Sequence, residues 1–398
     1  MQLARRHFLA AAGSAATLAL LPRRGGAQTI HLPFENGERP VVAFPQKRPL
    51  LLLTPRPPQL ETPFAVFDNG VVTANDAFFV RWHEAQIPEK VDATTHRIAV
   101  TGAVNRALSL SLDDLAGMET IEYLAVNQCS GNGRGLSSPR VAGGQWENGA
   151  MGNARWTGVR LRDVLDRAGL KPSAKQVQFN GLDGPVLPST PPFRKSLDLA
   201  VAQADDVMIA YAMNDAPLPL LNGYPVRLIV PGWYSTYWVK MLAAVTVLDH
   251  VDDNFWMKSA YRIPDTPDNS VVPGATGFPT IPINRMRVRS FITNFADSAT
   301  LQAGPQTVRG IAFDGGSGIA RVELSSDGGT TWLDAALEQD YGNYSFRRWN
   351  ATFDAKPGLR ALAVRATAND GAIQTPKAGW NPSGYLRNVI ETYAVTVQ

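Results

Sequence analysis

The sequence predicts an α+β fold, in which a mixed α/β domain is followed by a β-sandwich of immunoglobulin-like size. With 398 residues the chain is long for a single core, so two folded domains are expected. The 34 glycines and 29 prolines predict many turns and short strands. At about residue 283 the pattern changes from alternating strands and modest helices to period-two alternation, which places the domain boundary there.

Residues 1–27 are predicted to be an export signal and not part of a folded domain. A basic start is followed by an apolar run from Phe8 to Leu21, and small residues extend to Ala27. The pair Arg5-Arg6 resembles a twin-arginine signal, which exports proteins already folded around a cofactor. The apolar run is shorter than the ~20 residues of a membrane span. A periplasmic location, reached by the twin-arginine route and without a membrane span, is therefore expected.

The charge of the remaining chain is close to neutral. Removing residues 1–27 deletes four arginines and no acid, so 38 basic residues become 34 against 35 acidic ones, a net charge of −1. Bulk charge thus gives no reason to expect binding to nucleic acid or to a membrane surface. A single cysteine excludes an internal disulfide, and no C-x-x-C-H motif for covalent haem is present.

Residues 28–75 are predicted to be an extended N-terminal segment that packs on a domain without forming one, because prolines recur along it. Residues 76–282 are predicted to be the mixed α/β domain. Leu161, Val164, Leu165 and Ala168 have helical spacing and Gly169 follows as a C-cap, which predicts a short amphipathic helix. Strands are expected in HRIAVTG, IEYLAVNQ, KQVQFNG, YPVRLIV and MLAAVTVLD. No G-x-G-x-x-G or P-loop motif occurs.

Residues 283–398 are predicted to form the sandwich. Two stretches, TVRGIAFDGGSGIARVELSSDGGTTWLDAAL and RALAVRATAND, alternate with period two, and the first contains a hairpin signal at residues 327–329. The cysteine pair of antibody domains is missing.

Cys129, the only cysteine, ends the apolar run IEYLAVNQ and precedes Gly131, Gly133 and Arg134. A lone cysteine is usually a small buried hydrophobic residue. Glycines that allow close approach, and an arginine that favours the thiolate, indicate instead a metal ligand or a nucleophile. A Cys129–His83 pair remains open as a cofactor-free thiol hydrolase. The scattered histidines lack the ligand spacing of a usual zinc site.

Two further groups of residues could bind an anion. Arg81 and His83 are two apart on an extended segment and face the same side of it. Arg227 lies inside the apolar run YPVRLIV, where an unpaired charge is costly. Either a phosphate or carboxylate partner or a structural salt bridge would explain it, and both remain open. Tyr211 and Lys240 lie in the same aromatic and apolar region.

The ordered motifs of the chain resemble the sulfite oxidase family of molybdenum enzymes, above all its bacterial periplasmic sulfite dehydrogenases. The resemblance covers nearly all of the chain after residue 27, in the motifs FFVRWH, NQCSGNGRG, GNARWTGVRLRDVLDRAG, FNGLDGPV, AYAMND, LNGYPVRLIVPGWYSTYWVK, VRSFIT, RGIAFDGG, LSSDGGTTW and WNPSGYLRN. It implies a molybdopterin-binding catalytic domain over residues 76–282 and an immunoglobulin-like dimerisation domain over residues 283–398.

The resemblance also implies the cofactor and the site. The cofactor is one molybdopterin carrying molybdenum, with Cys129 as its protein thiolate ligand, and no haem is expected in this chain. The residues implied for catalysis are Tyr211, Arg81, His83, Arg134 and Arg387. The residues implied for cofactor binding are Phe79, Arg81, His83, Cys129, Asp183, Asn222, Arg227 and Lys240. Vertebrate members have a histidine in place of Asn222. They also have an arginine in place of Ser383, so the assignment of Arg387 in the same motif has less support from the family pattern.

The implied activity is oxidation of sulfite to sulfate in the periplasm, with electrons passed one at a time to a separate acceptor such as a c-type cytochrome or a haem subunit. A homodimer is expected. The alternatives within the family are the sulfane dehydrogenase of thiosulfate-oxidising complexes and the periplasmic methionine-sulfoxide reductase type. The alternatives outside it are the Cys129–His83 thiol hydrolase and a non-catalytic binding protein built on the sandwich.

Overall fold

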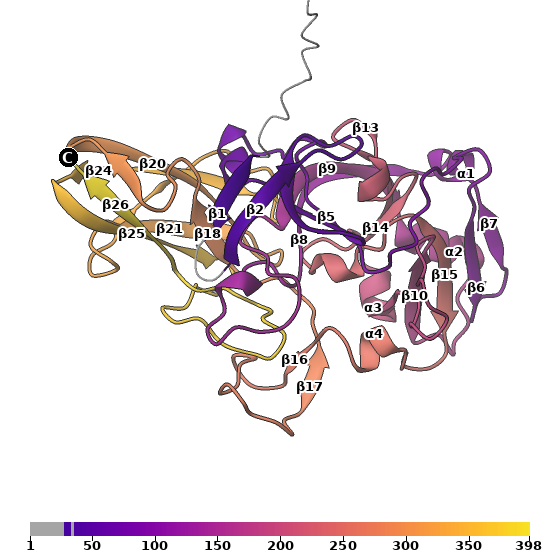
Figure 1. Cartoon of the computed structure of the whole chain (residues 1–398). Coiled ribbons are helices and arrows are strands. Elements are labelled where there is room, and N and C mark those ends of the chain that lie inside the picture. The colour runs from indigo at the N-terminus through magenta and orange to yellow at the C-terminus, as the bar shows by residue number, and fades with distance from the viewer. Residues whose placement is uncertain (1–27, 33–35) are drawn as a thin grey trace, which may run out of the picture.

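The computed structural model describes residues 28–32 and 36–398. The export signal predicted over residues 1–27 lies outside the described residues. Figure 1 shows three parts: the mixed α/β domain, a small N-terminal sheet in indigo, and the C-terminal sandwich in orange and yellow. In the described part of the chain, no helix is both long and apolar enough to cross a membrane.

The N-terminal segment folds into an antiparallel sheet, where the sequence predicted an extended strap. Its strands follow one another in space as β1 (Thr29–Leu32), β2 (Gly37–Val42), β3 (Leu50–Pro55), β4 (Pro58–Glu61) and β5 (Val80–Arg81). Pro55 and Pro58 lie at the ends of β3 and β4, so the tight turn between these strands accommodates them. The sheet packs Leu50, Leu60 and Val80 against Trp82 and Met241. The prolines therefore do not prevent strands here, and Pro40 even lies inside β2.

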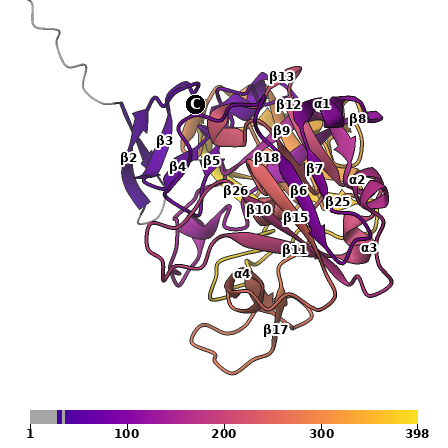
Figure 2. The same cartoon turned by 90° about the vertical axis from the view of Figure 1, so that its right-hand side faces the viewer.

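Two sheets build the mixed domain (Figure 2). The first has the order β11 (Arg194–Asp198), β10 (Gln176–Gly181), β15 (Leu242–Leu248), β6 (Ile98–Gly102) and β7 (Leu108–Leu110), and only its β15–β6 pair is parallel. The second has the order β13 (Ala216–Pro217), β12 (Met208–Met213), β9 (Met151–Arg160) and β8 (Thr120–Gln128), with β14 (Arg227–Ile229) also paired to β12. Each of the five predicted strands is present.

The helices of this domain are short: α1 (Leu112–Ala116), α2 (Leu161–Ala168), α3 (Leu199–Ala202) and α4 (Phe255–Lys258). Helix α2 is the predicted one. Its four apolar residues are buried, and Gly169 ends it at φ +71°, a conformation that glycine adopts readily. These elements share one large apolar core, which extends to Phe291, Phe313 and Phe346 of the C-terminal domain.

The C-terminal domain is the predicted β-sandwich. One sheet has the order β18 (Arg289–Ile292), β20 (Gly304–Phe313), β24 (Arg347–Ala355) and β23 (Ala336–Leu337). The other has the order β19 (Ala299–Leu301), β26 (Glu391–Val397), β25 (Gly358–Ala368), β21 (Ile319–Ser325) and β22 (Leu333–Asp334). The predicted hairpin joins β21 to β22. Between the two domains lies the small pair β16 (Arg262–Pro264) and β17 (Thr280–Pro282).

Candidate active site

Cys129 lies where β8 leaves the second sheet of the mixed domain. Strand β8 pairs with β9 without a break up to Gln128, and the Cys129 amide donates to Ala150 O at 2.9 Å. The chain then turns, because the Asn132 amide donates back to Cys129 O at 3.0 Å. The cysteine is 7% exposed. A rigid sheet thus fixes its backbone, while the loop that follows can shape a cavity around it.

The glycines of this loop make room for arginine side chains. A Cβ atom at Gly131 would lie 2.7 Å from Cζ of Arg134, and one at Gly143 would lie 2.8 Å from its Nη1. Arg134 is therefore folded back onto the loop, where its Nε donates to Ser383 O at 2.8 Å and its Nη1 to Gly144 O at 3.2 Å. The close approach predicted from the glycines holds, and what approaches is the Arg134 guanidinium.

A cavity of about 420 Å³ opens beside Cys129. It brings the cysteine together with two arginines, Arg81 and Arg134, and with two tyrosines, Tyr261 and Tyr385. The tyrosine rings stack in parallel at 5.7 Å, and the Arg134 guanidinium lies 5.1 Å from the centroid of Tyr385. Two arginines at one small cavity favour a small anion as its occupant.

A second, narrower cavity lies next to the first and shares Arg81 with it. Its lining includes six residues predicted for cofactor binding: Phe79, Arg81, His83, Asn222, Arg227 and Lys240. They come from β5 and the segments beside it, from a 3-10 helix (Leu220–Asn222), from β14 and from the turn before β15. Asn127 and Ser235 complete the polar lining.

His83 is held as a neutral imidazole in the wall between the cavities. Its ring stacks on Phe193 at 3.6 Å, and its Nε2 forms a hydrogen bond with the hydroxyl of Tyr261. Burial lowers the pKa of His83 well below its ordinary value, and the cations Arg81, Lys240 and Lys195 lower it further. No hydrogen bond joins His83 to Cys129 among the described residues, so the geometry does not favour a Cys–His nucleophile.

Arg227 is buried without a carboxylate partner in the described part of the chain. Its Nη1 donates to Asn222 O at 2.9 Å and its Nη2 to Trp238 O at 3.1 Å, while Trp156 lies 5.2 Å from Cζ. Burial lowers the pKa of Arg227 to about 9. The structural salt bridge considered from the sequence is therefore wrong, and the anion partner remains as the explanation.

Lys240 lines the same cavity, and Asp183 is the carboxylate that acts on its charge. The Lys240 ammonium donates to Arg81 O at 2.8 Å and lies 4.4 Å from the ring centroid of Trp82. Burial lowers the pKa of Lys240, Arg227 lowers it further, and Asp183 acts in the opposite direction. Burial likewise raises the pKa of Asp183, and Lys240 opposes this rise. The cavity thus has more buried positive charge than the carboxylate beside it can balance.

The donor set fits an anionic, pterin-type cofactor. Several buried donors have no partner among the described residues: Arg81 Nη1, Asn127 Nδ2, Gln128 Nε2, Ser130 Oγ and Arg227 Nε. Buried donors without acceptors are costly in a finished site, so they indicate a ligand with several acceptors and negative charge. The described residues contain no group of three or more His, Cys, Asp or Glu side chains placed to hold a metal ion.

Tyr211 does not belong to this site, which corrects the prediction from the sequence. Its hydroxyl forms a 3.0 Å hydrogen bond with Oγ1 of Thr120, the first residue of β8. Cys129 follows the last residue of the same strand. Since a strand rises about 3.3 Å per residue, Thr120 and Cys129 lie roughly 30 Å apart. The tyrosines that line the pocket are Tyr261 and Tyr385.

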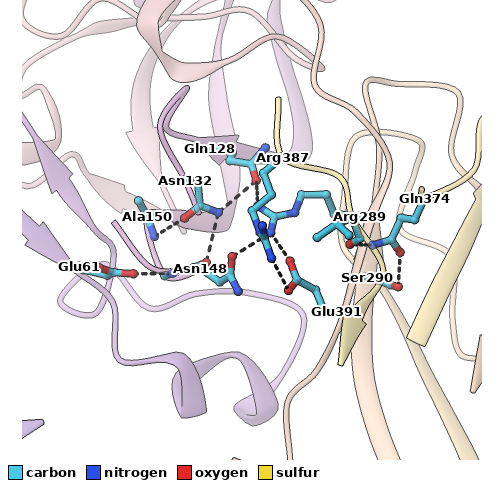
Figure 3. Close-up of polar contacts among 12 residues, drawn as sticks. Glu61, Gln128, Asn132, Asn148, Ala150, Arg289, Ser290, Gln374, Arg387 and Glu391 are labelled. Carbon is cyan, nitrogen blue, oxygen red and sulfur yellow. Dashed lines mark hydrogen bonds and ion pairs between the residues drawn. The ribbon is translucent and has the colours of Figure 1, made fainter. Parts of the chain in front are cut away.

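Arg387 does not line the pocket, and Figure 3 shows it near Gln128 and Glu391. Its Cδ is 2.5 Å from the position of a Cβ at Gly133, and its Nη2 is 3.4 Å from Glu391. Ser383 and Tyr385 line the pocket in its place. Arg387 therefore supports the loop and does not contact its contents.

Tyr261 and Tyr385 were missed by sequence reasoning. Tyr261 lies in a loop without periodicity, and its φ of +57°, unusual for a tyrosine, cannot be read from the sequence. Burial raises the pKa of Tyr261 and of Tyr385, so both hydroxyls keep their protons. Tyr385 stands inside WNPSGYLRN, so that motif offered a signal for it.

Comparisons with known proteins agree with this geometry. Residues 84–256 match the family described as "Oxidoreductase molybdopterin binding domain", and residues 280–398 match "Mo-co oxidoreductase dimerisation domain". The fold matches the crystal structure of the sulfane dehydrogenase SoxCD from Paracoccus pantotrophus, with a TM-score of 0.76 at 24% identity over 98% of this chain and 93% of that one.

Related sequences extend the comparison. Identity is 34% to mitochondrial sulfite oxidase of Mus musculus, over 89% of this chain and 67% of the relative. Identity to sulfite oxidase of Gallus gallus is 32%, over 90% of this chain and 79% of the relative. Identity to sulfite oxidase of Arabidopsis thaliana is 29%, over 86% of this chain and 93% of the relative. The chain spans about two thirds of the length of the mitochondrial relatives, between 64% and 67%.

The fold and the matched domains define the class: a molybdenum oxidoreductase with a molybdopterin-binding domain and a C-terminal β-sandwich. Within this class, the chain belongs to the sulfite oxidase family. Its cofactor is accordingly the molybdenum cofactor.

Proposed function

We propose that this protein oxidises sulfite to sulfate at molybdenum held by Cys129. The observation that carries the proposal is that two neighbouring cavities share Arg81 in their linings. One presents Cys129, Arg81, Arg134 and Tyr261 to a small anion. The other presents Arg81, Arg227 and Lys240 to an anionic group of the cofactor. A thiolate ligand suits a redox metal.

The cofactor supplies the two-electron oxidation, and the chain binds and orients the substrate. Arg81 and Arg134 hold the oxyanion by charge-assisted hydrogen bonds. The Tyr261 hydroxyl, fixed by His83, is placed to bond an oxygen of the anion. Arg227 and Lys240 are suited to a phosphate of the cofactor; Phe79 and Asn222 line the same cavity, and Asp183 acts on the charge of Lys240. His83 stays neutral, so it accepts or donates one hydrogen bond and adds no charge.

We further propose that the protein works in the periplasm as a homodimer and passes electrons one at a time to a separate c-type cytochrome or haem subunit. The twin-arginine pattern at Arg5-Arg6 supports the location. The match to a dimerisation domain over residues 280–398 supports the dimer. Because the matched crystal structure is that of a sulfane dehydrogenase, a sulfane substrate is the second activity to assay.

Purified protein with its molybdenum content measured tests this function. Sulfite is assayed with ferricyanide and with cytochrome c as acceptors, and a sulfane substrate is assayed in parallel. The expected result is sulfite-dependent reduction of both acceptors in proportion to molybdenum content. A full molybdenum load with turnover of the sulfane substrate alone would replace sulfite by the second activity. No turnover of either substrate would refute both.

A further inference from the structure

A lysine without a countercharge lies directly behind the wall of the anion pocket. Lys195 lies in β11 and is 0% exposed. Within the described part of the chain its ammonium makes one hydrogen bond, to Trp256 O at 2.8 Å, and no carboxylate lies within salt-bridge distance. By comparison, the buried Lys47 donates to three oxygens: Asn75 O, Phe78 O and Asn222 Oδ1.

The surroundings of Lys195 connect it to the pocket. Its Nζ lies 4.6 Å from the ring centroid of Tyr237 and 5.4 Å from that of Tyr261. Tyr261 and Trp256 both line the cavity beside Cys129. The side chains of Tyr261 and Trp256 therefore separate the ammonium from the pocket, and the face of the Tyr261 ring points toward the ammonium.

The charges around Lys195 leave its own charge uncompensated. Asp252 is the nearest acid to act on it, but the Asp252 carboxylate accepts hydrogen bonds from Gln178 and Asn254 at 2.6 and 2.8 Å, and one from Ser196. Arg262 adds positive charge on the same side, and Asp198 acts on Tyr237. Burial lowers the pKa of Lys195 to about 7. An anion in the pocket would raise this pKa and favour the charged form.

We propose that Lys195 is a positioning residue of the anion pocket. From behind Trp256 and Tyr261, its ammonium fixes the Tyr261 ring by a cation–π contact and supplies positive charge that the bound oxyanion balances. The proposal deepens the proposed function and depends on it only for the identity of the oxyanion, sulfite or its product sulfate. It explains why a fold keeps a buried ammonium with so few partners.

The substitution Lys195→Met tests this in the molybdenum-loaded enzyme. Methionine keeps the length of the side chain and removes the charge. Because replacing a poorly paired buried charge by an apolar side chain is often neutral or stabilising, the melting temperature should stay the same or rise. Sulfate affinity, followed by tryptophan fluorescence with sulfate as the probe, should fall on the order of tenfold, as expected for one charge lost nearby.

The pH dependence separates this role from a purely structural one. The difference in sulfate affinity between the native protein and Lys195→Met should be largest near pH ~6, where the ammonium is charged, and should shrink toward pH ~9. Lys195→Arg, which keeps the charge, should retain most of the sulfate affinity. The matched control is Lys258→Met on α4, an exposed lysine close to the pocket rim, which should leave the affinity unchanged because solvent screens it.

Three outcomes overturn the proposal: a Lys195→Met protein that fails to fold or melts lower, native sulfate affinity in Lys195→Met, and an affinity loss that does not depend on pH. The readout does not need turnover. If the native enzyme fails to oxidise sulfite but sulfate affinity still depends on Lys195, the proposed function fails and the role of Lys195 stands. If sulfite turnover is present and the affinities agree, only the role of Lys195 fails.

Discussion

At the scale of single residues, the site is built from buried cations that the described protein does not neutralise. Arg227 has only carbonyl acceptors and aromatic faces around it, and Arg81 leaves Nη1 without a partner. Such an arrangement is costly in a folded chain and becomes favourable when an anion occupies it. The same logic applies to both cavities, because each is lined by arginine or lysine side chains.

Tyr261 should be required for efficient turnover and Tyr211 should not. Tyr261→Phe removes the hydroxyl that faces the pocket and bonds His83, so we expect kcat/KM for sulfite to fall roughly ten- to a hundredfold. Tyr211→Phe makes the same chemical change at the far end of β8 and should leave kcat/KM unchanged. Steady-state kinetics on both variants, normalised to molybdenum, decides the matter. Equal losses in the two variants would contradict the assignment.

Sequence reasoning located most of the pocket because its residues stand in short motifs. Arg81 and His83 share one face of an extended segment, and Cys129 ends a strand that could be recognised by its apolar run. It failed at Tyr211, because a tyrosine among apolar residues gives no measure of its distance from Cys129. Tyr261 reaches the pocket only through tertiary packing of a loop with an unusual backbone conformation.

At the scale of elements, the loop after β8 is held from the C-terminal domain. Arg289 of β18, 1% exposed, donates to Asn148 Oδ1 at 2.8 Å and to Glu391 of β26 at 2.7 Å (Figure 3). It also reaches Gln128 Oε1 at 3.4 Å, directly before Cys129. The sandwich thus takes part in shaping the active site through Arg289, whereas the family resemblance had implied a contribution from Arg387.

Arg289→Met should destabilise the protein by about 3 to 5 kcal/mol, because it leaves Glu391 buried with only Arg387 beside it at 3.4 Å. Adding Glu391→Gln removes the stranded charge, so the double variant should recover at least about 1 kcal/mol of that loss. Urea denaturation of the two single variants and the double variant measures this coupling. Strictly additive effects would show that the Arg289–Glu391 pair does not act as a unit.

The N-terminal sheet shows where pattern reading was incomplete. Prolines between residues 40 and 63 suggested a chain without secondary structure, yet strands β2, β3 and β4 form around them. Two prolines lie at strand ends, where a missing amide donor costs nothing. The final strand, β5, comes from the segment that carries Arg81. That pairing is non-local, so no local pattern could have predicted it.

At the scale of the whole molecule, the buried carboxylate of Glu61 ties the N-terminal sheet to the loops that support Cys129. Glu61, the last residue of β4, accepts hydrogen bonds from the Gly149 and Glu147 amides at 2.8 and 3.1 Å. The Glu147 carbonyl in turn accepts from the Gly133 amide at 2.6 Å. Burial raises the pKa of Glu61 to about 7, although both amides and Arg39 act to lower it.

The raised pKa of Glu61 gives a defined pH dependence of stability. The protonated acid contributes stability that is fully present below its ordinary pKa of 4.5 and is lost as the pH rises through about 7. The loss amounts to about 3 kcal/mol between these limits. The Glu61→Gln variant has no acid at this position and should not lose this stability. The difference in free energy of unfolding, variant minus native protein, should therefore increase as the pH rises from 4.5 to about 7. Parallel curves for the two proteins in urea denaturation would show that Glu61 has no such shift.

The central claim is that Cys129 holds the molybdenum at which sulfite is oxidised. X-ray absorption at the molybdenum edge, compared between the native protein and Cys129→Ser, tests it most directly. We predict that the variant folds, binds molybdopterin, shows one sulfur ligand fewer at molybdenum and has lost sulfite oxidation. An unchanged sulfur shell with retained sulfite oxidation in Cys129→Ser would contradict the claim.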